Sequence, residues 1–169
     1  MDLQNLLQKL PPVRDWIERT LAAHRTESRS VASYRFPRLT QFYSPVFLET
    51  AFVVIVPRLP IVPMASLGLR ELESFEKAEH AAITYRNTSF MLEAGSADES
   101  LHFHELIHVI QWQQLGVEGF LTAYANGIIE HGYRDNPLEV MAYDLQAHFD
   151  QGGPPMDVKS AVRSRLARR

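Results

Sequence analysis

The chain of 169 residues contains no cysteine, no long apolar run and little net charge. The absence of cysteine excludes a disulfide framework and any metal site built from thiolates. The longest apolar stretch, 47–57, is too short to span a bilayer and contains Glu49. A net charge of −3 gives no strong attraction for nucleic acid or for a membrane surface. These absences favour a soluble, cytoplasmic protein that has neither nucleic acid nor a membrane as partner.

The most informative segment is His104-Glu105-Leu106-Ile107-His108, which has the pattern HExxH. The apolar residues around it recur with helical spacing, so the segment is predicted to lie on a helix. Residues four apart lie on one face of a helix, which lets both imidazoles reach a single metal ion. Glu105 can then face a water bound to that metal and act as its general base. Zinc enzymes use this combination to hydrolyse amides.

The ends of this helix also have sequence signals. Ser96 and Glu99 have the spacing of a capping box, which predicts the start of a helix. Gly116 follows the last apolar residue, as a left-handed residue that ends a helix would. The HExxH helix is therefore predicted at about 97–115.

A catalytic zinc needs a third protein ligand, and Glu139 is the leading candidate because of its surroundings. Asn136 is a suitable N-cap and Pro137 a suitable first residue for a helix at about 137–149. Glu139 then lies in the first turn, where a short, stiff segment can hold a carboxylate in place. A glutamate at this position is also typical of a residue that only caps its helix.

Other histidines compete for a place in the site. His131 is the main alternative third ligand, because the loop after it could bring it to the metal and give a three-histidine site. His148 would lie more than two turns beyond Glu139 on the same helix, so it is a weaker candidate. His102, two residues before His104, should point to another face of the helix.

Two segments carry a resemblance to a known family: His104-Glu105-xx-His108 and Gly132-Tyr133-Arg-Asp-Asn-Pro-Leu-Glu139-xx-Ala142. Together they resemble the gluzincin branch of the zincin metallopeptidases, mainly over residues 80–150. The resemblance implies that His104, His108 and Glu139 bind Zn²⁺ and that Glu105 is the general base. In that family an antiparallel edge strand precedes the active helix, lines the cleft and can pair with extended substrate. The segment 82–92 occupies the place of that strand in the chain.

Amide hydrolysis also needs a hydrogen-bond donor for the developing oxyanion, besides the metal. Tyr133, six residues before Glu139, is the first candidate, and Tyr143 and His131 follow. The ligand histidines need an acceptor for their second ring nitrogen. Asp144 is one candidate, although a solvated carboxylate on the helix surface explains it equally well.

Patterning predicts further elements along the rest of the chain. Helices are predicted at 2–10, ended by Pro11-Pro12, at 13–24, at 67–75 and at 117–129, the last with a break near Gly127. A buried strand is predicted at 48–56, a strand-turn-strand unit at 82–92, a loop at 25–34 and an extended connection at 57–63.

These elements predict an α+β fold in which a small, mostly antiparallel sheet packs on the HExxH helix and further helices. Residues 1–151 are expected to form a single zincin-like metallopeptidase domain, followed by a basic tail at 152–169. We expect the tail to be a solvated, partly frayed end. A basic helix that contacts an acidic face, a partner or nucleic acid is the alternative.

The predicted function is zinc-dependent hydrolysis of peptide bonds in a peptide or protein substrate. One alternative is a catalytically inactive zincin-like domain that binds metal or other proteins. The presence of Glu105 argues against it, because structural zinc has no need of a base. A second alternative is a regulatory metallopeptidase that cuts one cellular protein.

Overall fold

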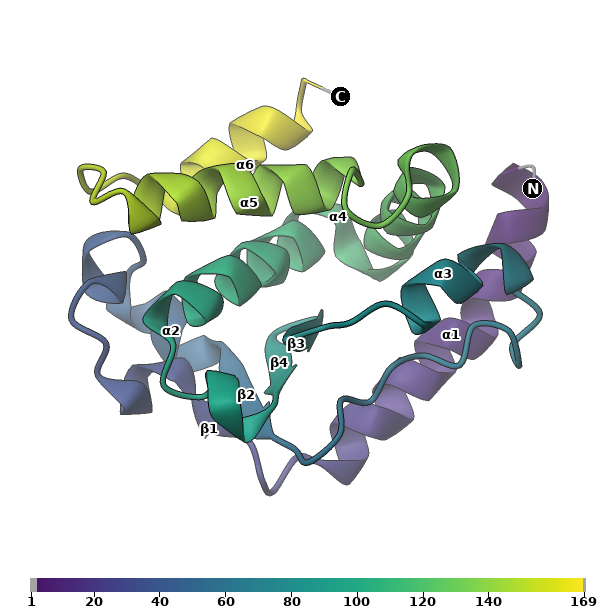
Figure 1. The fold of residues 1–169 in the computed structure, drawn as a ribbon, viewed down its shortest axis with the longest axis horizontal. Helices are drawn as coiled ribbons and strands as arrows, with labels where there is room; N and C mark the ends of the chain where they lie inside the picture. The colour runs from purple at the N-terminus through teal and green to yellow at the C-terminus, as the bar shows by residue number, and fades with distance from the viewer. Residues whose placement is uncertain (1–2, 169) are drawn as a thin grey trace.

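The computed structural model describes residues 3–168, with side chains from residue 8 onward, and has an α+β architecture (Figure 1). The helices are α1 (Leu3–Ala23), α2 (Pro45–Thr50), α3 (Glu73–Glu76), α4 (Glu99–His131), α5 (Pro137–Asp150) and α6 (Val158–Leu166). The strands are β1 (Arg29–Ser30), β2 (Phe52–Ile55), β3 (Ala82–Tyr85) and β4 (Thr88–Met91). Short 3₁₀ turns occupy Val31–Tyr34, Leu39–Gln41, Arg70–Leu72 and Glu93–Gly95.

Within the described residues, the strands form one mixed sheet in the order β1-β2-β4-β3. The β1–β2 and β3–β4 pairs are antiparallel, as expected, but β2 and β4 are parallel. The parallel pair was not predicted. It arises because the long connection at 56–81 places the second strand of the later hairpin, and not its first, beside β2. β3 is consequently an edge strand.

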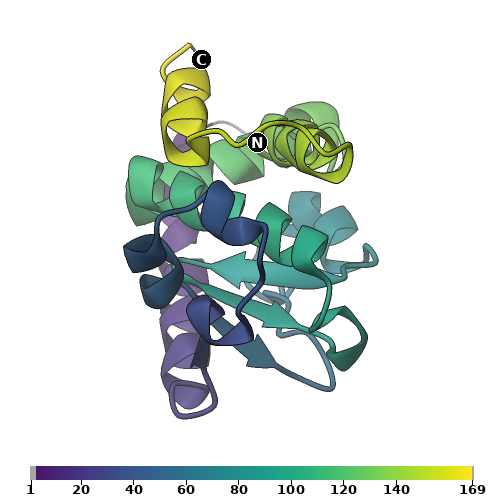
Figure 2. The ribbon, with the colours of Figure 1, turned by 90° about the vertical axis from the view of Figure 1, so that its left-hand side faces the viewer.

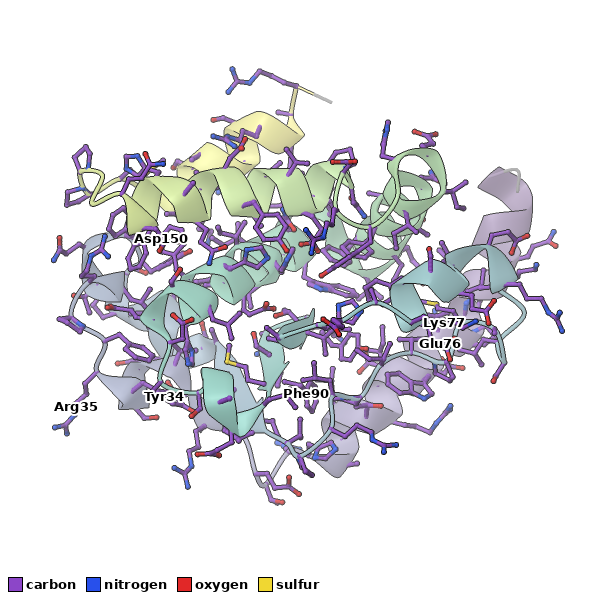
Figure 3. The ribbon with its side chains drawn as sticks, in the orientation of Figure 1. Tyr34, Arg35, Glu76, Lys77, Phe90 and Asp150 are labelled. Carbon is purple, nitrogen blue, oxygen red and sulfur yellow. The ribbon has the colours of Figure 1, made fainter. Side chains whose placement is uncertain are left out.

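The two faces of the sheet pack against different helices (Figures 1 and 2). Alternate strand residues point to opposite faces, so each strand contributes to both cores. Val53, Ala82 and Met91 pack with the first part of α4. Val54, Ile83 and Phe90, the last labelled in Figure 3, pack with α1. The sheet therefore separates α4 from most of α1, and β3 lies beside α4 at the open edge.

The N-terminal segment forms one continuous helix, α1, where the sequence predicted two helices separated by Pro11-Pro12. A proline inside a helix removes one backbone hydrogen bond and crowds the preceding turn, which was the reason to expect an end there. Leu10, Val13 and Ile17 are nevertheless buried on one face of α1. Burying this face against the sheet outweighs the local cost of the two prolines.

The segment predicted as a strand at 48–56 is divided between α2 and a shorter strand, β2. The Ser44 hydroxyl accepts a hydrogen bond from Phe47 N, and Pro45 occupies the first helical position. This Ser-Pro pair is a regular helix-start signal that the apolar composition of the segment obscured.

Several other local predictions are confirmed. The strand-turn-strand unit at 82–92 is the hairpin of β3 and β4. The helix predicted at 67–75 is present as a 3₁₀ turn followed by α3, and 57–63 contains no strand. None of the helices in residues 3–168 combines the length and the apolarity that crossing a membrane requires.

The C-terminal segment contradicts the expected frayed end. Asp157 caps α6, because its carboxylate accepts a hydrogen bond from Ser160 N. Val158 and Val162 are fully buried in the core that α4 and α5 share. Arg165 also lies 3.3 Å from the Asp144 carboxylate. These contacts hold the segment against the rest of the molecule.

Candidate metal centre

The helix that carries the HExxH segment begins at Glu99, two residues later than predicted, and has a different cap. Asp98, and not Ser96, accepts hydrogen bonds from the first turn of α4, at Ser100 N and Leu101 N. The carboxylate of Glu99 instead accepts hydrogen bonds from the backbone of the 3₁₀ turn before α2, at Arg38 N and Leu39 N. Glu99 therefore ties the start of α4 to that turn.

Gly116 divides α4 into two halves, 99–115 and 117–131. Its φ of 69° lies in the left-handed region that favours glycine, as the sequence predicted for the end of the first helix. The break predicted near Gly127 is wrong, because that residue is helical. A Cβ at Gly127 would lie 2.5 Å from Asn136 Oδ1, so this glycine permits a close approach between α4 and the start of α5.

The start of α5 is fixed by Asn136, the predicted N-cap. Its side-chain oxygen accepts a hydrogen bond from Leu138 N, and its amide nitrogen donates to Tyr124 O in the second half of α4. This double contact sets where the first turn of α5 lies. Glu139, in that turn, is only 3% exposed and points toward the HExxH residues.

His104, His108 and Glu139 form a buried cluster whose potential ligand atoms all lie within 4.8 Å of one another. The two Nε2 atoms are 3.1 Å apart. Each of them lies 3.4 Å from one carboxylate oxygen of Glu139. In Figure 3 the side chains of α4 and α5 meet in the space between these helices. The structure thus brings together the three residues predicted as ligands.

The tautomer of His108 follows from its neighbour Gln111. The Gln111 amide nitrogen donates to Leu138 O, which can only accept, so its oxygen must face His108. That oxygen lies 2.9 Å from His108 Nδ1. Nδ1 is therefore an N–H donor, so in the neutral imidazole, which is the form that binds a metal, Nε2 presents its lone pair to the cluster.

The same arrangement holds for His104. Gln146 on α5 donates from its amide nitrogen to Ser100 Oγ at 2.8 Å, and its oxygen lies 2.9 Å from His104 Nδ1. Nε2 of His104 is consequently also an acceptor. Asp144, the acceptor considered from the sequence, is instead an exposed residue beside Arg165. Two neutral amides take the role that carboxylates often have beside metal-binding histidines.

Two imidazole lone pairs and a carboxylate therefore converge on one point. Glu139 Oε2 is buried and has no hydrogen-bond partner among the described residues. Burial disfavours a charge on His108, but the nearby Glu139 carboxylate outweighs burial and raises the His108 pKa. Burial likewise opposes ionisation of Glu139, yet the two histidines lower the pKa of its carboxyl. The buried cluster could therefore hold a metal ion.

Tyr124, in the second half of α4, is a site residue that the sequence did not identify. Its hydroxyl donates to Glu139 Oε1 at 2.6 Å. Burial, and then the charge of Glu139, raise its pKa well above the usual value, so the hydroxyl stays protonated. Local sequence pattern does not reveal this role, because the partner of Tyr124 lies on another helix.

Glu105, the predicted base, is held by the edge strand β3. The Thr84 hydroxyl donates to Glu105 Oε2 at 2.6 Å and lies 2.7 Å from Ser89 Oγ on β4. Trp112 Nε1 donates to Thr84 O at 3.1 Å. The strand lies beside the motif as the sequence led us to expect, but this carbonyl is already bonded and is not free to pair with another chain.

The candidate oxyanion donors occupy different places. Tyr133 lines the same cavity as the cluster, and its hydroxyl lies 3.3 Å from His80 Nδ1. Because His80 Nε2 donates to a backbone carbonyl, Nδ1 accepts from Tyr133. Tyr143 is half-exposed, with its ring 4.7 Å from that of His104. His131 is exposed and lies beside Glu130, outside the cluster.

Two further histidines also lie outside the cluster. His148, at the far end of α5, has its Nε2 2.9 Å from Pro154 O. His102 points away from the cluster, as predicted, and its ring lies against the stacked rings of Tyr34 and Phe36. His102 Nε2 is 2.9 Å from Ser96 O.

The chain has no match among protein-family models, curated proteins or solved structures. The chemistry of the cluster therefore follows from its geometry. His104, His108 and Glu139 form a possible metal site that spans α4 and α5, and the carboxylate of Glu105 lies in the same cavity.

Proposed function

We propose that this chain is a zinc-dependent metallopeptidase, with His104, His108 and Glu139 as ligands and Glu105 as general base. The observation that carries the proposal is the convergence of two imidazole lone pairs and a carboxylate beside a second carboxylate. A purely structural metal site has no use for that second carboxylate. Zinc, when bound, would polarise the peptide carbonyl and acidify a water molecule.

Glu105 is placed to move a proton. Its Oε2 atom is held by the Thr84 hydroxyl, which fixes the orientation of the carboxylate. The other oxygen is left to accept a proton from the attacking water. Glu105 then donates that proton to the leaving amine of the cleaved peptide bond.

Tyr133 is our choice for the donor that stabilises the oxyanion. Burial, and then the charge of Glu139, raise the pKa of Tyr133, which keeps its hydroxyl protonated at neutral pH. His80 Nδ1 accepts a hydrogen bond from this hydroxyl in the resting site, so the hydroxyl is already orientated within the cavity. A small rotation about the Cζ–O bond would redirect the proton to the substrate.

The burial of the cluster favours a narrow substrate. His104, Glu105, His108 and Glu139 are each between 3% and 6% exposed. A peptide must therefore insert into the cavity to reach them. This supports a peptidase with few substrates over one that degrades any unfolded protein.

The metal content of the purified protein tests the ligand set. We expect about one zinc per chain in the wild type, by mass spectrometry, and none in His104→Ala or Glu139→Ala. Asp144→Ala is the matched control, because it removes an exposed carboxylate from the same helix as Glu139. Zinc that is lost in His104→Ala and kept in Glu139→Ala would place the third ligand elsewhere.

The metal content does not test whether Glu105 acts as the general base, so a substitution of Glu105 is needed as well. Glu105→Gln should keep its zinc and lose peptide hydrolysis by at least about a hundredfold, assayed with a peptide library. Glu118→Gln, which alters an exposed carboxylate on the same helix, should keep both. Equal hydrolysis by Glu105→Gln and the wild type would remove Glu105 from the mechanism. A wild type that binds no zinc would favour the inactive, protein-binding alternative.

A further inference from the structure

Each of the three cluster residues has one hydrogen-bond partner outside the cluster, and all three partners are uncharged. Gln146 and Gln111 each accept from a histidine Nδ1 at 2.9 Å, and Tyr124 donates to the carboxylate at 2.6 Å. Among residues 8–168, no charged side chain outside the cluster makes a hydrogen bond or an ion pair with these three residues. The site is therefore supported by neutral groups alone.

The charge of such a partner affects how tightly a histidine binds a metal. A carboxylate that accepts from the second ring nitrogen makes the imidazole a more basic ligand. An amide oxygen orientates the ring in the same way, but it carries no net charge. A histidine with an amide partner is therefore aimed at the metal but binds it less tightly than a histidine with a carboxylate partner.

At Gln111 the packing of α4 on α5 requires an amide. The side chain is fully buried, and its nitrogen donates to Leu138 O at 2.9 Å and lies 3.7 Å from Met141 Sδ. An ionised carboxylate in this place would face these two acceptors without a proton to offer. Burial without a donor keeps a carboxyl group protonated, so a glutamate here would also be a neutral partner.

The surroundings of Gln146, in contrast, accommodate a carboxylate as well as an amide. The side chain is only partly buried, and its nitrogen donates to Ser100 Oγ at 2.8 Å and to Ser100 O at 3.4 Å. A hydroxyl can donate as well as accept, so Ser100 can turn toward a carboxylate. Glutamate has the length of glutamine and would keep the contact with His104. Packing therefore does not explain why this partner is neutral.

We propose that Gln146 sets the zinc affinity of the site and keeps it below what the three ligands can reach, so that the metal exchanges with the zinc available around the protein. Gln146 acts through His104 and is a positioning residue, not a catalytic one. The inference rests on the proposed function, because it concerns the regulation of the same site. It makes peptide hydrolysis depend on the supply of zinc.

Gln146→Glu tests this without turnover. Zinc affinity is measured by competition with a chelator at about pH 8, where protons compete little for the ring nitrogens. We expect Gln146→Glu to bind zinc about tenfold more tightly than the wild type and to release it to excess chelator more slowly by a similar factor. Gln113→Glu adds the same charge at an exposed position of α4 and should keep the wild-type affinity. Equal affinity in Gln146→Glu and the wild type would overturn the proposal and leave the proposed function intact.

Gln111→Glu is the matched control inside the site. Its carboxyl group should stay protonated against Leu138 O, so zinc affinity should not rise. An equal rise in both glutamate variants would contradict the role assigned to Gln146. If Gln146→Glu does not fold, Ser100→Asp places a carboxylate beside the Gln146 nitrogen, in the first turn of α4, where a helix favours negative charge. This variant should also tighten zinc binding, by a smaller factor, and unchanged affinity would overturn the proposal.

The same titrations separate this proposal from the proposed function. Tighter binding by Gln146→Glu, in a protein that binds zinc but hydrolyses no peptide, would support the role of Gln146 while the peptidase function falls. A wild type that binds no zinc, beside a Gln146→Glu variant that does, would have the same meaning. Absence of zinc binding in both proteins would overturn both proposals.

Discussion

The two halves of α4 that Gly116 separates use their buried polar residues differently. The first half carries two of the three cluster residues, His104 and His108, and the proposed base Glu105. The second half carries no residue of the cluster, but Tyr124 donates to Glu139 and Gly127 leaves room for the cap of α5. The first half thus contributes the proposed reactive groups, and the second half helps to position Glu139.

This difference shows that a helical motif is only part of a metal site. Two histidines on one helix face provide two ligand atoms, but a third must come from a separate element. The position of that third atom depends on how two helices pack. The first half of α4 packs along α5, and the second half contacts the first turn of α5 through Tyr124 and Gly127. The following predictions test how the two halves differ.

The largest effect is expected in the first half. His108→Ala removes a proposed ligand from the cluster, so zinc affinity should fall by more than about a hundredfold. That is a larger fall than is expected when a residue that only supports a ligand is lost. A competition titration with a chelator measures it. Gln113→Ala, an exposed change in the same half, is the control. Unchanged affinity in His108→Ala would place the metal elsewhere.

A substitution in the second half should lower zinc affinity although the substituted residue contacts none of the proposed ligands. In Gly127→Ala the new Cβ would meet Asn136 Oδ1 at 2.5 Å, so the cap and the first turn of α5 must shift. We expect zinc affinity to fall about tenfold to a hundredfold, as when supporting groups are lost.

Gly119→Ala is the matched control for that prediction. Its Cβ would find its nearest neighbour at 3.5 Å, which is an ordinary contact. Alanine favours the helix over glycine by up to about 1 kcal/mol, so this variant should unfold at a higher temperature and keep its zinc affinity. If both glycine variants behave alike, the close approach at Gly127 does not position Glu139.

A smaller effect is expected for Tyr124→Phe. The variant keeps the ring and removes the hydroxyl that donates to Glu139 Oε1. Zinc affinity should fall by about tenfold, the lower end of the range for supporting contacts, because the carboxylate loses one fixed partner. Tyr143→Phe serves as control in the same titration. Affinity equal to the wild type would mean that α5 alone orientates the carboxylate.

The smallest effect should come from His102→Phe, in the first half. His102 is buried two residues before His104, but its ring lies against the stacked rings of Tyr34 and Phe36, away from the cluster. The variant should bind zinc as the wild type does, measured by metal content and by the same titration. A loss of zinc would show that location in the first half matters more than the direction of the side chain.

Local sequence signals were sufficient for much of the candidate site. The HExxH spacing, Gly116 as a helix end and the Asn136-Pro137 start of α5 each depend on a few neighbouring residues, and the structure has all three. The same kind of signal failed at Pro11-Pro12 and at 48–56. At Pro11-Pro12, packing of α1 on the sheet outweighed the tendency of proline to end a helix. At 48–56, the prediction missed the helix cap formed by Ser44 and Pro45.

The supporting groups could not be predicted from local pattern. Gln111 and Gln146 fix the histidine tautomers, and Tyr124 holds Glu139. The partners of Gln146 and Tyr124 lie on a different helix, and the orientation of Gln111 is set by a carbonyl of α5. The parallel pairing of β2 with β4 has the same origin, since it depends on where the chain returns after 56–81.

The sequence by itself determined which residues could be ligands and base, because helical geometry places positions 104 and 108 on one face whatever surrounds them. Only the tertiary structure decided that Glu139 joins them while His131 and His102 do not, and that apolar side chains of α1 line the same cavity as the cluster. Those outcomes depend on the packing of α5 on α4 and of α1 beneath the sheet. Contacts between residues far apart in the chain, and not local preference, fix that packing.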